Sequence, residues 1–315
     1  MATTIATTYA GQNKEKYIRE MLLAGKTLDN GGMTIFPNVA YKEVIQKAAL
    51  SGIISNGSCD YLALSDQGTL ALTERVLEVE EYQVNKTECT KTFSQTWQAA
   101  QMQGKLDGRK LPATFSDFIV QYYVAKIAAQ MENTIWSGVN ANAGEFDGIT
   151  TILAANAASL AGGAVVTGTT VNAGNVILEI SKVVDNVTAN SPALLGQADL
   201  KIYVGSSIFQ SYIRALGGFA ITNTGTDNKM TQWWDGNSGL TYDGIEVFLA
   251  PGLPANQMVC TTVGNLFFGC GILDDMSEIR LIDTSQTLGD QNVRFVARWK
   301  AGVQVGLLEE VTYYA

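Results

Sequence analysis

The chain has 315 residues and a formal net charge of −9, and it contains no histidine. Only 16% of its residues are charged and 46% are hydrophobic, whereas ordinary soluble domains have about 25% charged residues. The absence of histidine excludes Ser-His-Asp and Cys-His catalysis, and it excludes histidine as a metal ligand. The low charge content favours a surface that partners cover. The alternative is a monomer with a polar, uncharged surface.

The length is sufficient for one large domain or two smaller ones. No run of 18 apolar residues is present, so we expect no membrane span. The first 17 residues lack the basic and apolar regions of a signal peptide, and none is expected. Lysine and arginine are scattered, which argues against tight binding to a phosphate backbone.

No motif predicts a catalytic, cofactor-binding or metal site, and an enzyme is not expected. The cysteines are too widely spaced for zinc and are expected to be reduced structural thiols: Cys59, Cys89, Cys260 and Cys270. Carboxylates cluster as in solvated faces or turns, at Glu78, Glu80 and Glu81 and at Asp274 and Asp275. The glycine pairs at 162–163 and 217–218 lack the spacing of phosphate-binding loops.

Residues 1–37 have the composition of an arm. The first ten are small and rich in threonine, residues 14–23 favour a short helix, and Gly31 and Gly32 interrupt the chain. A segment with so little apolar content is not expected to fold alone, so it must lie on something else. A frayed terminus is the alternative.

Residues 40–50 suggest one or two helical turns, and residues 53–92 suggest a long hairpin. Asn56-Gly57 and Asp66-Gln67-Gly68 are turn signals. Residues 70–72 and 76–84 favour extended chain. A two-stranded excursion of this length is marginal by itself in water. The alternative is an ordinary hairpin packed on its own domain.

One long helix is predicted from Thr114, which can cap it together with Asp117, to Gly138. Its apolar face is a row at i+4 spacing, flanked by Phe118, Tyr122 and Ala128: Ile119, Tyr123, Ile127, Met131 and Ile135. About 22 residues make a rod of roughly 33 Å. Gly138 is expected in the left-handed conformation that ends helices. Gly148-Ile149 is expected to return the chain to an extended conformation.

The second half of the chain predicts an alternation of helices and strands. Residues 153–170 favour loop or short strand. A helix capped by Asn172 ends at Ser191-Pro192, and a helix capped by Ser206 ends at Gly217-Gly218. Strands are predicted at 200–204, 244–250, 258–262, 266–270, 278–282, 293–300 and 303–308.

The strand predicted at 293–300 has one basic and one apolar face. Arg294, Arg298 and Lys300 alternate with Val293, Phe295, Ala297 and Trp299. We interpret the basic side as a solvated face on an edge strand, where charge also prevents unwanted pairing. A specific salt-bridge role between subunits is the alternative.

The run from Thr114 to Ile149 resembles the spine helix of tailed-phage major capsid proteins, the Hong Kong 97 fold. The matching positions are Met131, Glu132, Ile135, Trp136, Gly138, Gly148 and Ile149. Residues 240–272 and 291–314 resemble the later strands of that family, so the resemblance extends over most of the chain. It implies an α+β fold with an N-terminal arm, an extended loop, a peripheral domain and an axial domain.

The resemblance also implies boundaries and a role. The expected parts are an arm (1–37), a helix and extended loop (38–92), a peripheral domain with the spine helix (93–150), an axial domain (151–285) and closing strands returning to the peripheral domain (286–315). The implied protein self-assembles as pentamers and hexamers into an icosahedral head around double-stranded DNA. Portal, scaffold and decoration proteins are the implied partners, with assembly in the host cytoplasm. Alternatives are an encapsulin-type bacterial nanocompartment and a non-viral binding protein.

Overall fold

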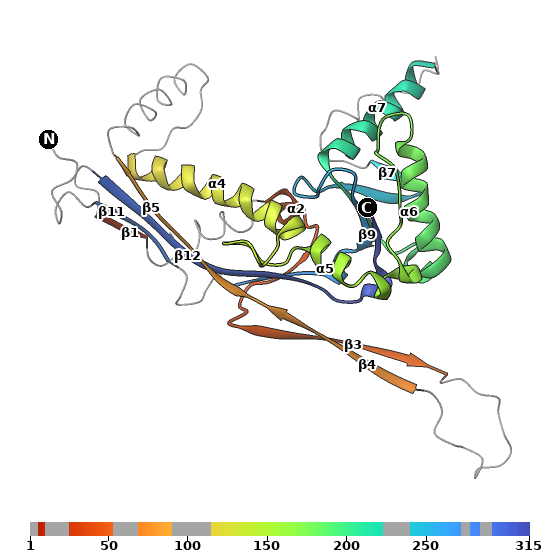
Figure 1. The fold of residues 1–315 in the computed structure, drawn as a ribbon, viewed down its shortest axis with the longest axis horizontal. Coiled ribbons are helices and arrows are strands. Elements are labelled where there is room, and N and C mark those ends of the chain that lie inside the picture. Colours follow the sequence, from red (N-terminus) through yellow and green to blue (C-terminus); the bar gives the residue numbers. More distant parts are fainter. Residues whose placement is uncertain are drawn as a thin grey trace, which may run out of the picture.

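The structure of the chain is a computed structural model. It describes residues 6–9, 25–52, 69–89, 115–222, 240–271, 278–283 and 292–315. Two β-sheets and the helices packed on them form an elongated α+β body, and a two-stranded ribbon projects from it (Figure 1). None of the helices in these residues is long and apolar enough to cross a membrane.

The larger sheet has six strands built around β12 (Asn292–Val305). Its order is β1 (Ala6–Tyr9), β11 (Glu278–Asp283), β12, β10 (Leu266–Cys270) and β2 (Thr34–Phe36), and β5 (Glu80–Cys89) also pairs with β12. Residues 293–298 of β12 pair with β11 and with β5 at once. The strands predicted at 293–300 and 303–308 are therefore one continuous strand. The prediction of an edge strand was wrong, because β12 has neighbours on both sides.

The long helix α4 (Phe115–Ser137) lies across one face of this sheet (Figure 1). Its 23 residues confirm the predicted rod, and four of the five residues in the predicted row are buried. The fifth, Tyr123, is partly buried and stacks on Phe295 of β12 with 4.7 Å between ring centroids. Tyr122, expected beside the apolar face, is exposed. Thr114, the predicted cap, lies outside the described residues.

The second sheet has the order β13 (Thr312–Tyr314), β9 (Met258–Thr262), β6 (Leu200–Val204), β8 (Ile245–Leu249) and β7 (Thr241–Tyr242). The helices α6 (Val176–Asn190) and α7 (Ser206–Thr222) pack against this sheet (Figure 1). The core of this half joins α6, α7 and the strands β6, β8 and β9. β13 pairs antiparallel with β9 at one edge of this sheet. Strands that are far apart in the sequence therefore lie side by side in it.

Two helix ends differ from the sequence prediction. α6 begins at Val176 and not at Asn172, whose side chain accepts a hydrogen bond from the Gly174 amide (2.8 Å) in the preceding turn. α7 continues through Gly217 and Gly218 to Thr222. Glycine inside a helix costs about 1 kcal/mol relative to alanine, which is too little to stop every helix.

The helical turns predicted at 40–50 are also wrong. This segment is the strand β3 (Lys42–Ser51), and it pairs antiparallel with β4 (Thr69–Glu78) over ten residues of each strand. Its sequence, with alanine, leucine, lysine and glutamate, favours a helix locally. The pairing with β4 overrides this preference, and the register joins Lys42 to Glu78 and Ser51 to Thr69.

The shorter elements connect these parts. They are the helices α2 (Lys26–Asp29) and α5 (Ile149–Ala155), with short 3-10 turns at Ala157–Ser159, Ala161–Gly163, Pro192–Leu194, Val263–Asn265 and Leu308–Glu310. Residues 25–37, expected to lie on something else, pack on this chain's own body. Thr27, Leu28 and Met33 are buried, and β2 pairs with β10.

Candidate assembly surfaces

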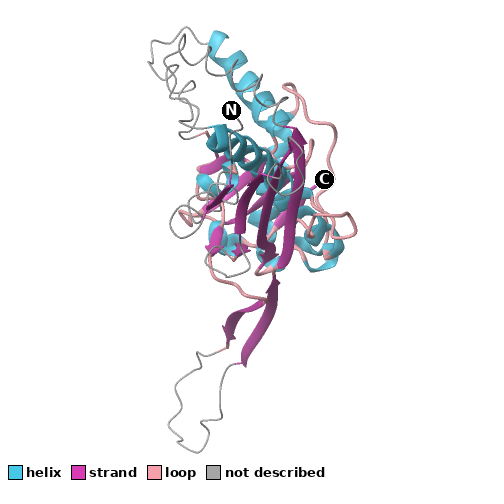
Figure 2. Cartoon of the chain, turned by 90° about the vertical axis from the view of Figure 1, so that its left-hand side faces the viewer, coloured by secondary structure: helices cyan, strands magenta, loops and turns pink. Residues whose placement is uncertain are grey.

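The projecting hairpin β3–β4 carries an exposed apolar face. The cross-strand pair Val44–Val76 and the β4 residues Leu70 and Leu72 lie on one side of the ribbon, which also carries the hydrogen-bonded pair Gln46–Glu74. Of these side chains, Val44, Leu70, Leu72 and Val76 are 51%, 59%, 62% and 42% exposed. The ribbon extends away from both sheets (Figure 2). Its predicted turn at 56–68 lies outside the described residues, and the extended chain predicted at 70–72 and 76–84 is confirmed. The hairpin predicted within residues 53–92 was wrong, because β4 pairs with β3 and β5 pairs with β12 of the larger sheet.

The root of the hairpin is fixed to the body. Leu77, Val39 and Val79 form a buried cluster with partly buried neighbours, among them Ile45, which faces away from the exposed apolar side. Gln304 donates a hydrogen bond from its side-chain amide to the Val76 carbonyl (2.7 Å). Its amide oxygen accepts one from the Arg75 guanidinium (3.1 Å). The direction of the ribbon is therefore set by its root, while Val44, Leu70 and Leu72 of its apolar face are each more than half exposed.

The end of α4 holds the segment before β2 through a buried carboxylate. The Thr27 amide donates to Glu132 Oε2 (3.2 Å), and the Thr27 hydroxyl donates to Oε1. Trp136 Nε1 in turn donates to the Thr27 hydroxyl oxygen (2.9 Å). Glu132 thus occupies the amino-terminal end of α2, where backbone amides favour a negative charge. Burial raises the pKa of Glu132, although hydrogen bonds from Thr27, Gly252 and Trp136 oppose that rise.

The two glycines after α4 permit a close approach of the backbone. An added Cβ on Gly138 would lie 2.4 Å from the Phe146 carbonyl oxygen, and the Gly148 amide donates to the Gly138 carbonyl (2.9 Å). Gly138 does not have the positive φ that the sequence predicted. Ile149 is the first residue of α5 and not part of an extended chain, and Gly148 is the N-cap residue of this helix. The motif residues therefore join α4, α2 and α5.

The basic side of β12 faces away from α4. Arg294 and Arg298 are exposed there, and Arg280 of the neighbouring β11 lies on the same side, opposite Val296. Arg294 Nε donates to the Thr87 hydroxyl (3.2 Å), and Lys300 Nζ donates to the Ala40 carbonyl (3.1 Å). The predicted basic face is present on an interior strand. Its role between subunits stays a prediction.

The other residues singled out by the sequence do not come together as a site. Cys260 and Cys270 are buried and free, and burial raises the pKa of each thiol to about 12. Cys89 is exposed, and Cys59, Asp274 and Asp275 lie outside the described residues. Among the described residues, no group of three histidine, cysteine, aspartate or glutamate side chains is placed to hold a metal.

Solved structures with this arrangement of elements come from phage capsids. A chain in a structure of the satellite phage P4 procapsid with its size determination protein is 12% identical, with a TM-score of 0.60 over 99% of this chain and 93% of that one. A chain from the capsid of a native GTA particle is 13% identical, with a TM-score of 0.53 over 100% and 93%. For the cyanophage A-1(L) capsid the values are 13%, 0.51, 100% and 96%.

These similarities establish the fold class. No protein family model and no curated protein matches the sequence. The chain has the Hong Kong 97 fold of phage capsid proteins, and the predicted α+β class is confirmed. The sequence found this fold through the spine helix. It missed Thr27 and the apolar face of β3, because Thr27 gains its role only from the distant Glu132 and β3 has a helix-like composition.

Proposed function

We propose that this chain is a major capsid protein, a structural subunit that assembles with its own copies into the icosahedral head of a tailed phage. The head encloses double-stranded DNA without binding it in a sequence-specific way. The protein assembles in the host cytoplasm and is part of the virion. It is a building block and not an enzyme. Portal, scaffold and decoration proteins are its further partners, and the arm, extended loop, peripheral and axial boundaries expected from the sequence are part of this proposal.

The observation that carries the proposal is the hairpin β3–β4. A two-stranded ribbon is marginally stable in water unless another surface covers it. Leu70 and Leu72 are each more than half exposed on a ribbon that extends beyond the body. Burying a leucine side chain fully stabilises a contact by about 1.5–3 kcal/mol. A second copy that covers this apolar face would supply the missing partner.

Repetition explains how such a ribbon can build a shell. In a closed symmetric assembly, each subunit gives its ribbon to one neighbour and receives the ribbon of another. Every contact then recurs around the shell, so an interface of modest size is sufficient when it is formed many times. The rigid root at Leu77 and Gln304 supports this role, because it directs the ribbon before any neighbour is bound.

A matched pair of variants tests the proposal. Leu72 and Thr73 are adjacent on β4 and both exposed, but their side chains lie on opposite faces of the ribbon. We expect the purified protein to form closed shells under electron microscopy, Leu72→Asp to stop assembly, and Thr73→Asp to leave it unchanged. Both variants should keep the thermal stability of the free subunit. A protein that stays a monomer under all conditions would contradict the proposal.

The contents of the particles separate the proposal from its nearest alternative. An encapsulin-type compartment would use the same subunit contacts but enclose a protein cargo. Particles isolated from their natural source are expected to contain double-stranded DNA, measured by nuclease-protected nucleic acid after the shells are opened. A protein cargo in place of DNA would favour the compartment.

A further inference from the structure

Apart from the projecting ribbon, β5 has the longest open edge among the described strands. It has ten residues and pairs with β12 on one side, and no other described strand pairs with it. The strands at the other edges of the two larger sheets are β1, β2, β7 and β13, with four, three, two and three residues. Short outer strands limit pairing between molecules, whereas a long open edge is a template for a further strand.

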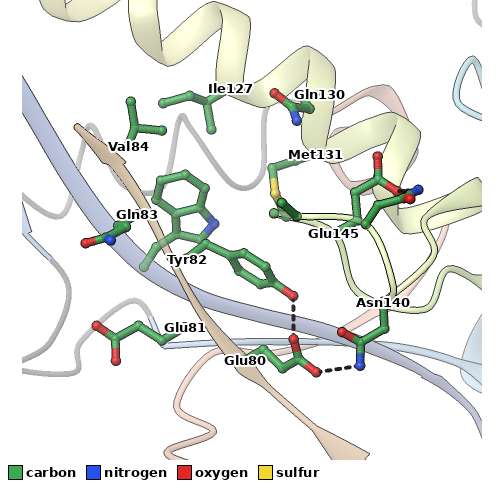
Figure 3. A pocket seen from close by; sticks show the side chains of 14 residues that line it. Glu80, Glu81, Tyr82, Gln83, Val84, Ile127, Gln130, Met131, Asn140 and Glu145 are labelled. Carbon is green, nitrogen blue, oxygen red and sulfur yellow. Dashed lines mark hydrogen bonds between the residues drawn. The ribbon is translucent and has the colours of Figure 1, made fainter. Parts of the chain in front are cut away.

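The described elements leave room beside the first half of β5 (Figure 3). A space of about 580 Å³ is lined by five consecutive residues of the strand, Glu80 to Val84, and α4 and the loop after it border the other side. Successive side chains of a strand point to opposite faces. A space that consecutive residues line therefore runs along the edge of the strand, where the backbone of another strand would lie.

The charges of β5 complement a second copy of the same strand. Its first two residues are Glu80 and Glu81, while Lys86 lies near its other end. In an antiparallel pair of identical strands, the beginning of each strand meets the end of the other. Residues opposite each other point to the same face of the joined sheet, so a symmetric pair matches only positions that differ by an even number.

One symmetric register places Lys86 opposite a glutamate over a long overlap. With Gln83 opposite Gln83 of the second copy, Glu80 lies opposite Lys86 twice, and Tyr82 lies opposite Val84 twice. Opposite charges and apolar pairs directly across a sheet stabilise it. The charged side chains, which normally protect an edge strand from other chains, would here favour the strand's own copy.

The neighbouring registers are less favourable. Centring the pair on Val84 places Glu80 opposite Glu88, and like charges directly across a sheet destabilise it. Centring it on Thr87 places Lys86 opposite Glu88, but only the last residues of each strand then overlap. The register centred on Gln83 is therefore the one that the charges select.

The bonds that Glu80 and Lys86 make within one chain leave both available for this pairing. Glu80 accepts hydrogen bonds from two uncharged groups, Asn140 Nδ2 (3.0 Å) and the Tyr82 hydroxyl (3.1 Å), as Figure 3 shows. Lys86 Nζ lies 3.6 Å from Glu88 Oε1, and the Lys86 side chain is 60% exposed. An exposed ion pair of this kind adds little stability, so Lys86 can turn to another carboxylate.

We propose that β5 pairs antiparallel with β5 of a second copy of this chain across a two-fold axis at Gln83, so that the larger sheets of the two copies continue as one sheet. The contact is isologous, because each copy contributes the same surface. In a shell, head-to-tail contacts close rings of subunits, and a two-fold contact of this kind joins one ring to the next. Only this place in the shell rests on the proposed function.

Disulfide trapping at Gln83 tests the register. Residues directly opposite in an antiparallel pair have Cα atoms about 4.5–5.5 Å apart, within the range of about 4.4–6.8 Å that a disulfide spans. In a chain that also carries Cys59→Ser and Cys89→Ser, Gln83→Cys should give cross-linked dimers when assembled shells are treated with oxidised glutathione. Asn85→Cys is the matched control, because Asn85 is exposed on the same face of β5 but its two copies would lie about 14 Å apart.

Two further combinations use the same register. Glu81 lies opposite Asn85, so a mixture of Glu81→Cys and Asn85→Cys subunits should cross-link although neither variant does so by itself. Lys86→Glu in the Gln83→Cys chain places like charges opposite each other and should lower the cross-linked fraction about tenfold, whereas adding Glu80→Lys should restore it.

The outcomes separate this contact from the proposed function. Shells in which Gln83→Cys subunits cross-link no more than Asn85→Cys subunits would overturn the β5 pairing and leave the proposed function intact. If the protein forms no shells, the proposed function fails, and the same cross-linking of the concentrated free subunit decides the pairing. Dimers confined to Gln83→Cys would then support it, and equal or absent cross-linking of the two variants would overturn it.

Discussion

Two buried carboxylates, Glu132 and Glu179, have pKa values shifted in opposite directions. Burial raises the pKa of Glu132, whose hydrogen-bond donors are all uncharged. Burial acts on Glu179 as well, but hydrogen bonds from Lys182 (2.7 Å), Tyr314 (2.7 Å) and Thr169 (2.9 Å) outweigh it and lower the pKa to about 2. The sign of each shift follows from whether a cation is present.

We expect Glu132→Gln to remove one pH-dependent part of stability. A raised pKa in the folded state means that Glu132 contributes stability below its unfolded pKa, and that this contribution is lost as pH rises through the folded pKa. Chemical denaturation between about pH 4 and pH 8 should therefore show that the wild type loses free energy of unfolding relative to the variant as pH rises. The measurement is the change of this difference in unfolding free energy with pH. Its absolute size is less informative, because the glutamine also changes the hydrogen bonds to Thr27.

Glu179→Gln provides the counterpart with the opposite sign. Its lowered pKa means that stability is present above the unfolded pKa of 4.5 and is lost as pH falls toward 2. The variant should lose roughly 1–3 kcal/mol at neutral pH, and the difference should shrink with acid. Equal slopes for both variants and the wild type would show that neither carboxylate is linked to folding in this way.

The apolar face of α4 gives a second test at the level of single residues. Ile127 is buried on the row that faces β12, while Gln130 is exposed. An unpaired carboxylate in the core costs several kcal/mol. We expect Ile127→Asp to abolish soluble expression and Gln130→Asp to be tolerated, measured by the soluble fraction and thermal unfolding. Equal tolerance of the two changes would mean that this row is not core.

At the scale of elements, the hairpin β3–β4 should be the least protected sheet in the free subunit. The backbones of its outer residues pair with each other, whereas Leu77, near the root, belongs to a buried cluster with Val39 and Val79. Few buried contacts give a low free energy of local opening. Amide hydrogen exchange should therefore be fast at residues 47–51 and 69–73 and slower toward residue 77.

Assembly should change this order. When a neighbour covers the apolar face, we expect protection of residues 47–51 and 69–73 to rise strongly, while the amides of α6 serve as an internal reference that stays unchanged. Slow exchange of the outer pairs already in the free subunit would identify an ordinary hairpin that needs no neighbour.

The elements that the sequence predicted well are those whose pattern and environment agree. α4 and α6 each pack an apolar stripe on a sheet, so the spacing of Ile119 to Ile135 and of Val176 to Val187 was sufficient. β3 was missed because its alternation is weak and its partner β4 begins 18 residues after it ends. The prediction that β12 is an edge strand was wrong, because the sequence alone does not show which strands lie on either side of it.

The candidate surfaces were predictable to different degrees. Only one strand of the exposed ribbon, β4, followed from turn signals and alternation, since these are local features, whereas β3 was predicted as helical turns. The hydrogen bond between Thr27 and Glu132 and the one between Asn140 and Glu80 join residues that are 105 and 60 positions apart in the sequence. Such contacts depend on how sheets and helices pack, and no local pattern encodes them.

At the scale of the whole molecule, residues 25–33 of the amino-terminal segment belong to the core of the body. Thr27 and Leu28 are part of the core and keep the buried Glu132 hydrogen-bonded. We therefore expect deletion of residues 2–24 to leave a soluble, cooperatively folding subunit, whereas deletion of residues 2–30 should cost several kcal/mol, because it leaves an unpaired buried carboxylate. Soluble yield and denaturation midpoints of the two deletions measure this difference.

The shorter deletion then tests the arm separately from folding. It also removes β1, which pairs with β11 at one edge of the larger sheet, so any loss of assembly should be compared with Thr7→Pro, which removes one amide of that strand in the full-length chain. If residues 2–24 act as an arm between subunits, the folded deletion variant should fail to form closed shells, while Thr7→Pro should still form them. Normal particles from the deletion variant would mean that the ribbon β3–β4, without the arm, is sufficient to close the shell.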